Sequence, residues 1–243
     1  MFSKQNIPLV ASVAFLSSAK AGKCPFGFDS DADSSNLTVQ HEHPRVQSAI
    51  NYPVDIFTCT GTAATTTVSG SMTVANYKAI VADVVAKYEA VADTIADNTN
   101  PRAKFAGCIV RTVGHDFMDY RNINGVETGG ADGCMAFSDA DNTGLPPCLQ
   151  NSGLQATYET YCATTSLADF LVIAAEAVMG RTSPTYDASD YYATGTLAKV
   201  YLENFSFGRT TRATCTEADG RMPNPENGCD GLKTIFVDHV YAS

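Results

Sequence analysis

The chain has 243 residues, of which 44% are hydrophobic, and it carries a formal net charge of −10 with a pI near 4.7. This length and composition are sufficient for one globular domain with its own core or for two small domains. The negative charge argues against a nucleic-acid-binding protein, because recognition of phosphates requires a basic surface.

The N-terminus has the pattern of a signal peptide. Lys4 precedes an apolar run from Ile7 to Leu16, and small residues follow as far as Ala21. The apolar run is too short to span a bilayer, and no later segment supplies about 20 consecutive apolar residues. We therefore expect residues 1–21 to be removed, leaving a secreted protein that is not embedded in a membrane.

Regular structure is expected only from about residue 73. Residues 22–72 mix Ser, Thr, Asp and Pro without a sustained period, which is typical of an irregular N-terminal arm. From Val74, apolar residues recur every three or four positions as far as Tyr88, and this spacing predicts an amphipathic helix that ends at residues 98–101.

The middle of the chain predicts further helices. A second amphipathic segment covers about 103–120, and a Gly- and Asn-rich loop follows at 122–133. Pro146 and Pro147 lie where a helix tolerates proline, in its first turn. Residues 166–179 are apolar nearly all round, which is typical of a buried central helix.

Turn residues dominate after Gly180, and a last short amphipathic segment covers 232–240. No segment shows the regular alternation expected of a strand. The predicted fold class is therefore mainly α.

All eight cysteines follow the predicted cleavage point: Cys24, Cys59, Cys108, Cys134, Cys148, Cys162, Cys215 and Cys229. An even number in an exported chain favours disulfides, although eight cysteines allow 105 connectivities. Chain proximity makes Cys215–Cys229 the first pair that we expect. A zinc site is the alternative, but the chain has no CxxC pair to support it. Sequons at Asn36 and Asn204 fit a secreted glycoprotein.

Arg111 and His115 are the candidate chemical pair. Their i, i+4 spacing places both side chains on one helical face. Histidine exchanges protons near neutral pH, and arginine stays positively charged. Heterolytic cleavage of a peroxide needs such a proton carrier and such a charge. On spacing alone, such a pair is more often a solvated helix face or a structural contact.

The surrounding sequence contains five ordered segments: VRTVGHD at 110–116, GGADGC at 129–134, NTGL at 142–145, SLADF at 166–170, and GRMPNP at 220–225 leading to Phe236. In type and order they resemble the plant-type haem peroxidase superfamily, and most closely its secreted fungal class. The resemblance covers about residues 80–243 and implies a haem-peroxidase-like helical domain over 73–243.

The resemblance implies haem b as cofactor, with reduction of hydrogen peroxide and oxidation of an organic donor. His115 would be the distal general acid–base, and Arg111 would polarise the oxygen–oxygen bond. Asn142 would accept the second ring N–H of His115 and fix its tautomer. The alternative for Asn142 is a turn or cap residue, a role that asparagine favours.

The resemblance also implies a structural calcium site. Asp116, Gly130 and Asp132 match the family's ligands in type, since calcium prefers carboxylate and carbonyl oxygens. Cys134 stands where the family usually has a Ser or Thr hydroxyl. A thiol is a poor calcium ligand, so either the site is weakened or Cys134 belongs to a disulfide.

Two departures from the family bear on activity. Gly114 replaces the aromatic residue that precedes the distal histidine, which predicts a wider distal pocket and a looser helix. The proximal haem ligand must also be a histidine. After His115 the chain has only His239, and its sequence context places it on the helix before the expected ligand. We therefore expect the domain to be truncated, with its proximal histidine beyond Ser243.

The remaining candidates are weaker. His41 and His43 lie in the predicted arm, where they are expected to be exposed. Tyr120, Tyr158 and Tyr161 could relay radicals, but among eleven tyrosines a structural role is the stronger expectation for each. Two alternatives to an enzyme stay open: an inactive, exported peroxidase-like binding module, and a disulfide-stapled surface or matrix protein.

Overall fold

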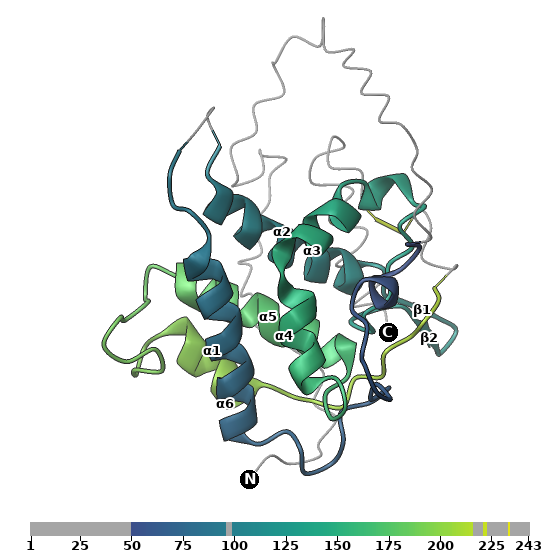
Figure 1. Cartoon of the computed structure of the whole chain (residues 1–243). Coiled ribbons are helices and arrows are strands. Elements are labelled where there is room, and N and C mark those ends of the chain that lie inside the picture. Colours follow the sequence, from purple (N-terminus) through teal and green to yellow (C-terminus); the bar gives the residue numbers. More distant parts are fainter. Residues whose placement is uncertain (1–49, 96–98, 216–220, 223–232, 234–243) are drawn as a thin grey trace, which may run out of the picture.

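The computed structural model describes residues 50–95, 99–215, 221–222 and 233. The described chain is mainly helical, as predicted (Figure 1). Its elements follow in the order η1 (Pro53–Asp55), α1 (Val74–Ala90), α2 (Pro101–Met118), β1 (Arg121–Ile123), β2 (Val126–Thr128), η2 (Ala140–Asn142), α3 (Leu145–Ser152), α4 (Leu154–Tyr161), α5 (Leu167–Thr182) and α6 (Leu197–Asn204).

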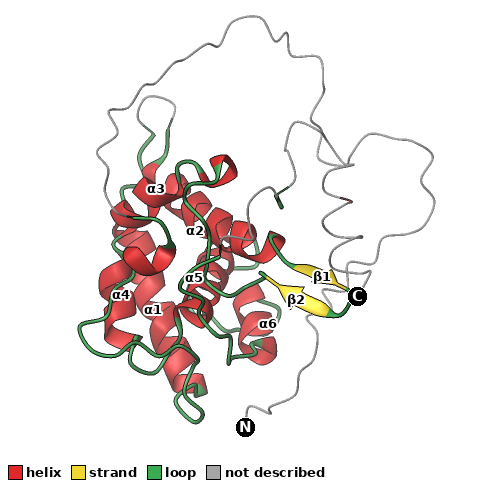
Figure 2. Cartoon of the chain, turned by 90° about the vertical axis from the view of Figure 1, so that its right-hand side faces the viewer, coloured by secondary structure: helices red, strands yellow, loops and turns green. Residues whose placement is uncertain are grey.

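Helix α5 is the central element of the core. It packs against α1, α2 and α6 and lies in the middle of the helical body in both views (Figures 1 and 2). Phe170, Ile173 and Ala174 are fully buried, as expected for a helix that is apolar nearly all round. The prediction of a buried central helix is therefore confirmed.

Side-chain caps define where the long helices begin. The hydroxyl of Thr73 accepts a hydrogen bond from the amide of Asn76 at 3.1 Å, and the Asn100 side chain accepts one from Ala103 at 3.0 Å. Ser166 caps α5 in the same way. Each cap satisfies an amide that has no partner inside the helix, which stabilises a start by about 1 kcal/mol.

The expectation of no strands is wrong at the segment predicted as a Gly- and Asn-rich loop. Strands β1 and β2 pair in antiparallel register, with Ile123 opposite Val126. The two residues that join them, Asn124 and Gly125, both have positive φ, at 54° and 80°. This is the backbone of a tight hairpin turn, which Asn-Gly favours. Figure 2 shows the hairpin at the edge of the helical body.

Helices α4 and α6 were not predicted from the sequence. Each has eight residues, and α6 follows a segment rich in turn residues. Thr196 caps α6, its hydroxyl accepting from the amide of Lys199 at 3.1 Å. The predicted helix at 232–240 lies outside the described residues, apart from residue 233.

The disulfides differ from the predicted pairing. Cys59 bonds to Cys162, Cys108 to Cys148, and Cys134 to Cys215, across 103, 40 and 81 residues. The expected Cys215–Cys229 pair is therefore wrong, because Cys215 bonds to Cys134. Packing brings together cysteines that are distant in the chain, so chain proximity was a poor guide.

The segment before α1 is mostly irregular but belongs to the core. Ile56 and Phe57 are buried, and the Phe57 ring contacts those of Tyr158 and Phe170, with centroids 6.0 and 6.2 Å apart. The Cys59–Cys162 disulfide ties this segment to the end of α4.

None of the helices in the described part of the chain has both the length and the apolar character needed to cross a membrane.

Candidate functional site

Helix α2 presents the predicted pair on one face. Arg111 and His115 are one turn apart, and the Arg111 Nε–H donates to His115 Nε2 at 3.2 Å. Arg111 is exposed and His115 half-buried, so the pair lies at the boundary between the core and solvent. The face shared by Arg111 and His115 is the one that the i, i+4 spacing predicts.

Asn142 reaches His115 from the short helix η2. Its Oδ1 lies 2.9 Å from His115 Nδ1, and its Nδ2 donates to the carbonyl of Ala136 at 2.9 Å. The second bond fixes the orientation of the amide, because only the nitrogen can donate. Oδ1 is thus the acceptor, so His115 carries its proton on Nδ1 and leaves Nε2 as the free base. The predicted contact between Asn142 and His115 is present.

Residues adjacent to η2 determine where this short helix begins and ends. The Asp139 side chain accepts from the amide of Asp141 at 2.9 Å and caps this single turn. Gly144 follows at a φ of 87°, a conformation that favours glycine, and it starts α3. The turn and the glycine together hold Asn142, which is buried, beneath His115.

Arg111 is held by the backbone of the same loop. Its guanidinium donates to the carbonyls of Thr143 at 2.9 Å and Asp141 at 2.8 Å. No carboxylate of the described residues forms an ion pair with it. The guanidinium is therefore oriented without its charge being neutralised.

The surroundings favour the neutral form of His115. Burial lowers the pKa of its imidazole, and the charge of Arg111 acts in the same direction. The hydrogen bond to Asn142 and the charges of Asp141 and Asp139 oppose this effect. The net lowering of the pKa keeps His115 able to accept a proton at neutral pH.

The first of the residues predicted to bind calcium, Asp116, directly follows His115. Asp116 is fully buried, and its two oxygens accept from the amides of Gly133 at 2.9 Å and Cys134 at 3.1 Å. The carbonyl of Gly130 accepts from the amide of Asp132 at 2.6 Å. Each predicted ligand is thus engaged with the backbone of the loop from Gly130 to Cys134.

Asp116 lies near two further carboxylates at this loop. The pKa of Asp116 is raised well above its ordinary value by burial, and further by the charges of Asp132 and Asp119. Arg212 lies 3.7 Å from Asp132. Among the described residues, however, no group of three or more His, Cys, Asp or Glu side chains is arranged to hold a metal ion. Carboxylate and carbonyl oxygens suit calcium, but the described residues do not form a complete site for the ion.

Cys134 and Gly114 are the two positions near His115 at which the sequence differs from the family pattern. Cys134 forms its disulfide with Cys215, so its sulfur is not a candidate calcium ligand. A Cβ placed on Gly114 would meet only Met118 Cε, at 3.8 Å, which is an ordinary contact distance. The helix therefore has room for a Cβ at position 114.

Several predicted features cannot be placed. Residues 1–21, the arm to residue 49 with His41, His43 and Asn36, and the C-terminal His239 lie outside the described residues. His115 is the only histidine among the residues that the structure describes. Of the three tyrosines singled out, Tyr158 is buried, whereas Tyr120 and Tyr161 donate to the carboxylates of Glu127 and Asp83.

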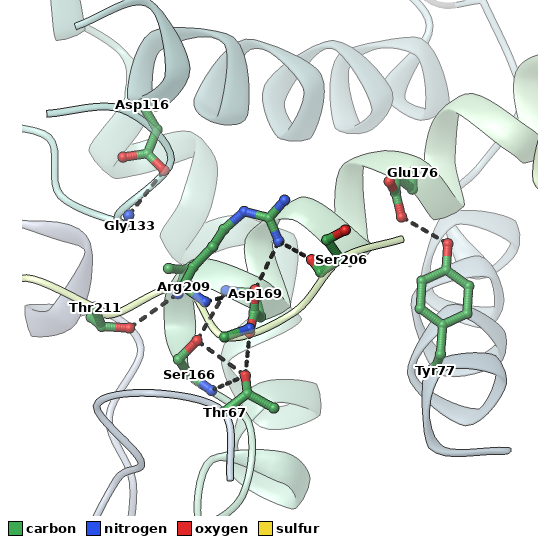
Figure 3. Close-up of polar contacts among 12 residues, drawn as sticks. Thr67, Tyr77, Asp116, Gly133, Ser166, Asp169, Glu176, Ser206, Arg209 and Thr211 are labelled. Atoms are coloured by element: carbon green, nitrogen blue, oxygen red, sulfur yellow. Dashed lines mark hydrogen bonds and ion pairs between the residues drawn. The ribbon is translucent and has the colours of Figure 1, made fainter. Parts of the chain in front are cut away.

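Two polar clusters on α5 were missed as possible sites (Figure 3). Asp169 is fully buried and pairs with Arg209 at 2.8 Å. Farther along α5, Glu176 accepts a hydrogen bond from Tyr77 at 2.8 Å. A carboxylate in the middle of a mostly apolar helix was the feature of the sequence that could have revealed Glu176.

Comparison with known proteins found no matching family model, no matching curated protein and no matching solved structure.

Proposed function

We propose that this chain is a secreted haem-peroxidase-type protein that reduces hydrogen peroxide and oxidises an organic donor. The observation that carries the proposal is the hydrogen-bonded row Arg111, His115 and Asn142. It combines a fixed cation, a neutral imidazole with a defined tautomer, and a buried amide that orients the ring. These are the groups needed for proton transfer within a peroxide.

In the proposed reaction, His115 Nε2 takes the proton from one peroxide oxygen and returns it to the other. Asn142 accepts the Nδ1–H throughout and stabilises the imidazolium that forms in between. The Arg111 guanidinium stabilises the departing oxygen. Because the Arg111 Nε–H donates to Nε2 in the described state, a peroxide O–H must replace that donor when it binds.

Haem b would supply the redox chemistry, namely the electrons that reduce the peroxide and the oxidising power returned to the donor. The described residues fit the distal side of such a group, because His115 and Arg111 share one accessible face. They include no second histidine, so no proximal ligand is assigned here. Calcium is part of the proposal, and its support is the group of carboxylates at this loop, where burial and the nearby charges of Asp132 and Asp119 raise the pKa of Asp116.

A second candidate function is a non-catalytic exported module that uses the same helices for binding or packing. The observation that favours it is that the Arg111 guanidinium already donates hydrogen bonds within the chain, to two carbonyls and to His115. The three disulfides fit either function.

Titration of the mature chain with haemin distinguishes the two candidates. The enzyme requires stoichiometric uptake, the visible spectrum of a bound ferric haem, and a spectral change when hydrogen peroxide is added; a histidine-ligated spectrum would show that a histidine of this chain holds the iron. Absence of uptake contradicts the enzyme and supports the module. The variant His239→Ala tests the ligand directly, and loss of the spectrum would contradict the expectation that His239 is not the ligand.

Gly114→Phe tests pocket width. Rates of peroxide consumption with small and bulky peroxides should diverge in the variant, because the phenylalanine narrows access beside His115. An identical size dependence in both proteins contradicts a role of Gly114 in access.

A further inference from the structure

A buried tyrosine meets a half-buried glutamate between α1 and α5, away from the His115 row. Tyr77 of α1 donates from its hydroxyl to Glu176 Oε2 of α5 at 2.8 Å, and its side chain is only 1% exposed. Figure 3 shows the two side chains pointing toward one another between their helices. The proposed peroxide reaction uses neither residue.

The carboxyl group is well suited to exchange a proton at neutral pH. Burial raises the pKa of Glu176 to about 7, while the hydrogen bond from Tyr77 and the charge of Arg209 oppose the rise. Burial and the charge of Glu176 raise the pKa of Tyr77 as well. The phenol of Tyr77 therefore stays protonated until it is oxidised.

Removal of one electron from Tyr77 reverses the preference of the phenol for its proton. The oxidised phenol is a strong acid, and a positive charge in an apolar core is costly. The nearest base, Glu176, already accepts the hydrogen bond through which the proton would move. A transfer along that bond neutralises the buried phenol and the half-buried carboxylate in one step.

We propose that Tyr77 is a redox-active tyrosine whose one-electron oxidation is coupled to proton transfer to Glu176. An outer-sphere one-electron oxidant takes one electron from the phenol, the O–H bond breaks, and the proton binds Glu176 Oε2. The products are the reduced oxidant, a neutral tyrosyl radical and a neutral carboxylic acid. A reductant returns the electron, and the proton returns with it. This inference does not rest on the peroxidase reaction.

The surroundings shield the radical from solvent. The Tyr77 ring packs against Phe205, with centroids 4.9 Å apart. Other tyrosines gather near Glu176, since its charge contributes to the raised pKa of Tyr192 and of Tyr201. Burial should therefore make a Tyr77 radical longer-lived than radicals at the surface.

The chain offers two matched control tyrosines. Tyr161 donates to Asp83 at 2.7 Å, which is the same phenol–carboxylate bond, but Asp83 is exposed. Tyr158 is about as buried as Tyr77, at 2% exposed, and burial alone raises its pKa to about 12. Comparing the three tyrosines separates the effect of burying the phenol from the effect of a half-buried base beside it.

The test oxidises the full chain with photogenerated tris(bipyridine)ruthenium(III) and follows the radical by rapid-freeze EPR. We expect a persistent neutral tyrosyl radical in the wild type, in Tyr161→Phe and in Tyr158→Phe. The persistent component should be lost in Tyr77→Phe. Retention of the same signal in Tyr77→Phe overturns the proposal.

Glu176→Gln tests the proton acceptor itself, because glutamine keeps the shape and the hydrogen-bonding oxygen but is not a base. Radical formation should be slower, and the solvent deuterium isotope effect of the wild type should be altered. An unchanged rate and an unchanged isotope effect overturn the coupling to Glu176.

A measurement on the wild type alone keeps the proposal testable if a variant does not fold. In D2O the EPR signal should narrow, because the radical oxygen accepts a hydrogen bond from the exchangeable Glu176 proton. A persistent radical without coupling to an exchangeable proton overturns the proposal.

Discussion

Replacing Asp169 by asparagine should destabilise the protein strongly. The carboxylate is fully buried and accepts from the Gly208 amide and the Arg209 guanidinium, both at 2.8 Å, and from the Thr67 hydroxyl. It therefore joins the segment before α1, the start of α5 and the segment after α6. In Asp169→Asn one of the two oxygens becomes an NH2 group that faces donors.

The burial of Asp169 and the partial exposure of Arg209 determine how much stability the variant should lose. Removing one partner of a buried ion pair costs about 3–5 kcal/mol, since the remaining charge is left unpaired. The Arg209 side chain keeps 23% exposure, so water solvates part of its charge. We therefore expect the free energy of unfolding to fall by about 2–4 kcal/mol. Equilibrium unfolding in urea, with the disulfides intact, measures it.

An exposed pair provides the control. Lys199 and Glu203 form an i, i+4 ion pair on α6 at 2.8 Å, with side chains 36% and 58% exposed. Glu203→Gln should change the free energy of unfolding by less than about 0.5 kcal/mol. A loss below about 1 kcal/mol in Asp169→Asn, or equal losses in both variants, would refute the reasoning from burial.

Three further predictions concern other parts of the molecule. Gly180→Ala should lower the free energy of unfolding by about 1–3 kcal/mol in a urea titration, since its Cβ would lie 2.7 Å from the Tyr191 hydroxyl oxygen; an unchanged midpoint contradicts this. The rate of the proposed peroxide reaction should hold as pH falls through the ordinary pKa of histidine and decline only below it, because the pKa of His115 is lowered and its neutral form is the base; a decline centred above pH about 6.5 contradicts this. Calcium should raise the melting temperature of the wild type but not of Asp116→Asn, by calorimetry with and without a chelator, and equal responses exclude a calcium site at this carboxylate.

The long helices could be predicted because their sequences carry both a period and a start signal. Helix α1 has its apolar residues at three- and four-residue spacing and begins after Thr73, a capping residue. The contact between His115 and Asn142 was predicted from the family resemblance. Spacing could not supply it, because the two residues are 27 positions apart and meet only through the turn η2.

Other features depended on information that periodicity does not carry. The hairpin was missed because Asn124-Gly125 was interpreted as general loop composition, whereas this dipeptide favours a two-residue turn. The disulfides join segments that only the packed core brings together. The Tyr77–Glu176 pair required knowing that α1 packs against α5, since Tyr77 alone looks like one more apolar position of its helix.

The central claim is that His115 is the acid–base group of a peroxide reaction. The most direct test mixes the mature, haemin-loaded chain with hydrogen peroxide in a stopped-flow spectrometer, for the wild type and for His115→Leu. We predict that the second-order rate constant falls by about 10²–10⁴-fold in the variant, because proton transfer within the peroxide loses its carrier. A wild-type protein that binds haemin but reacts no faster than His115→Leu would contradict the account.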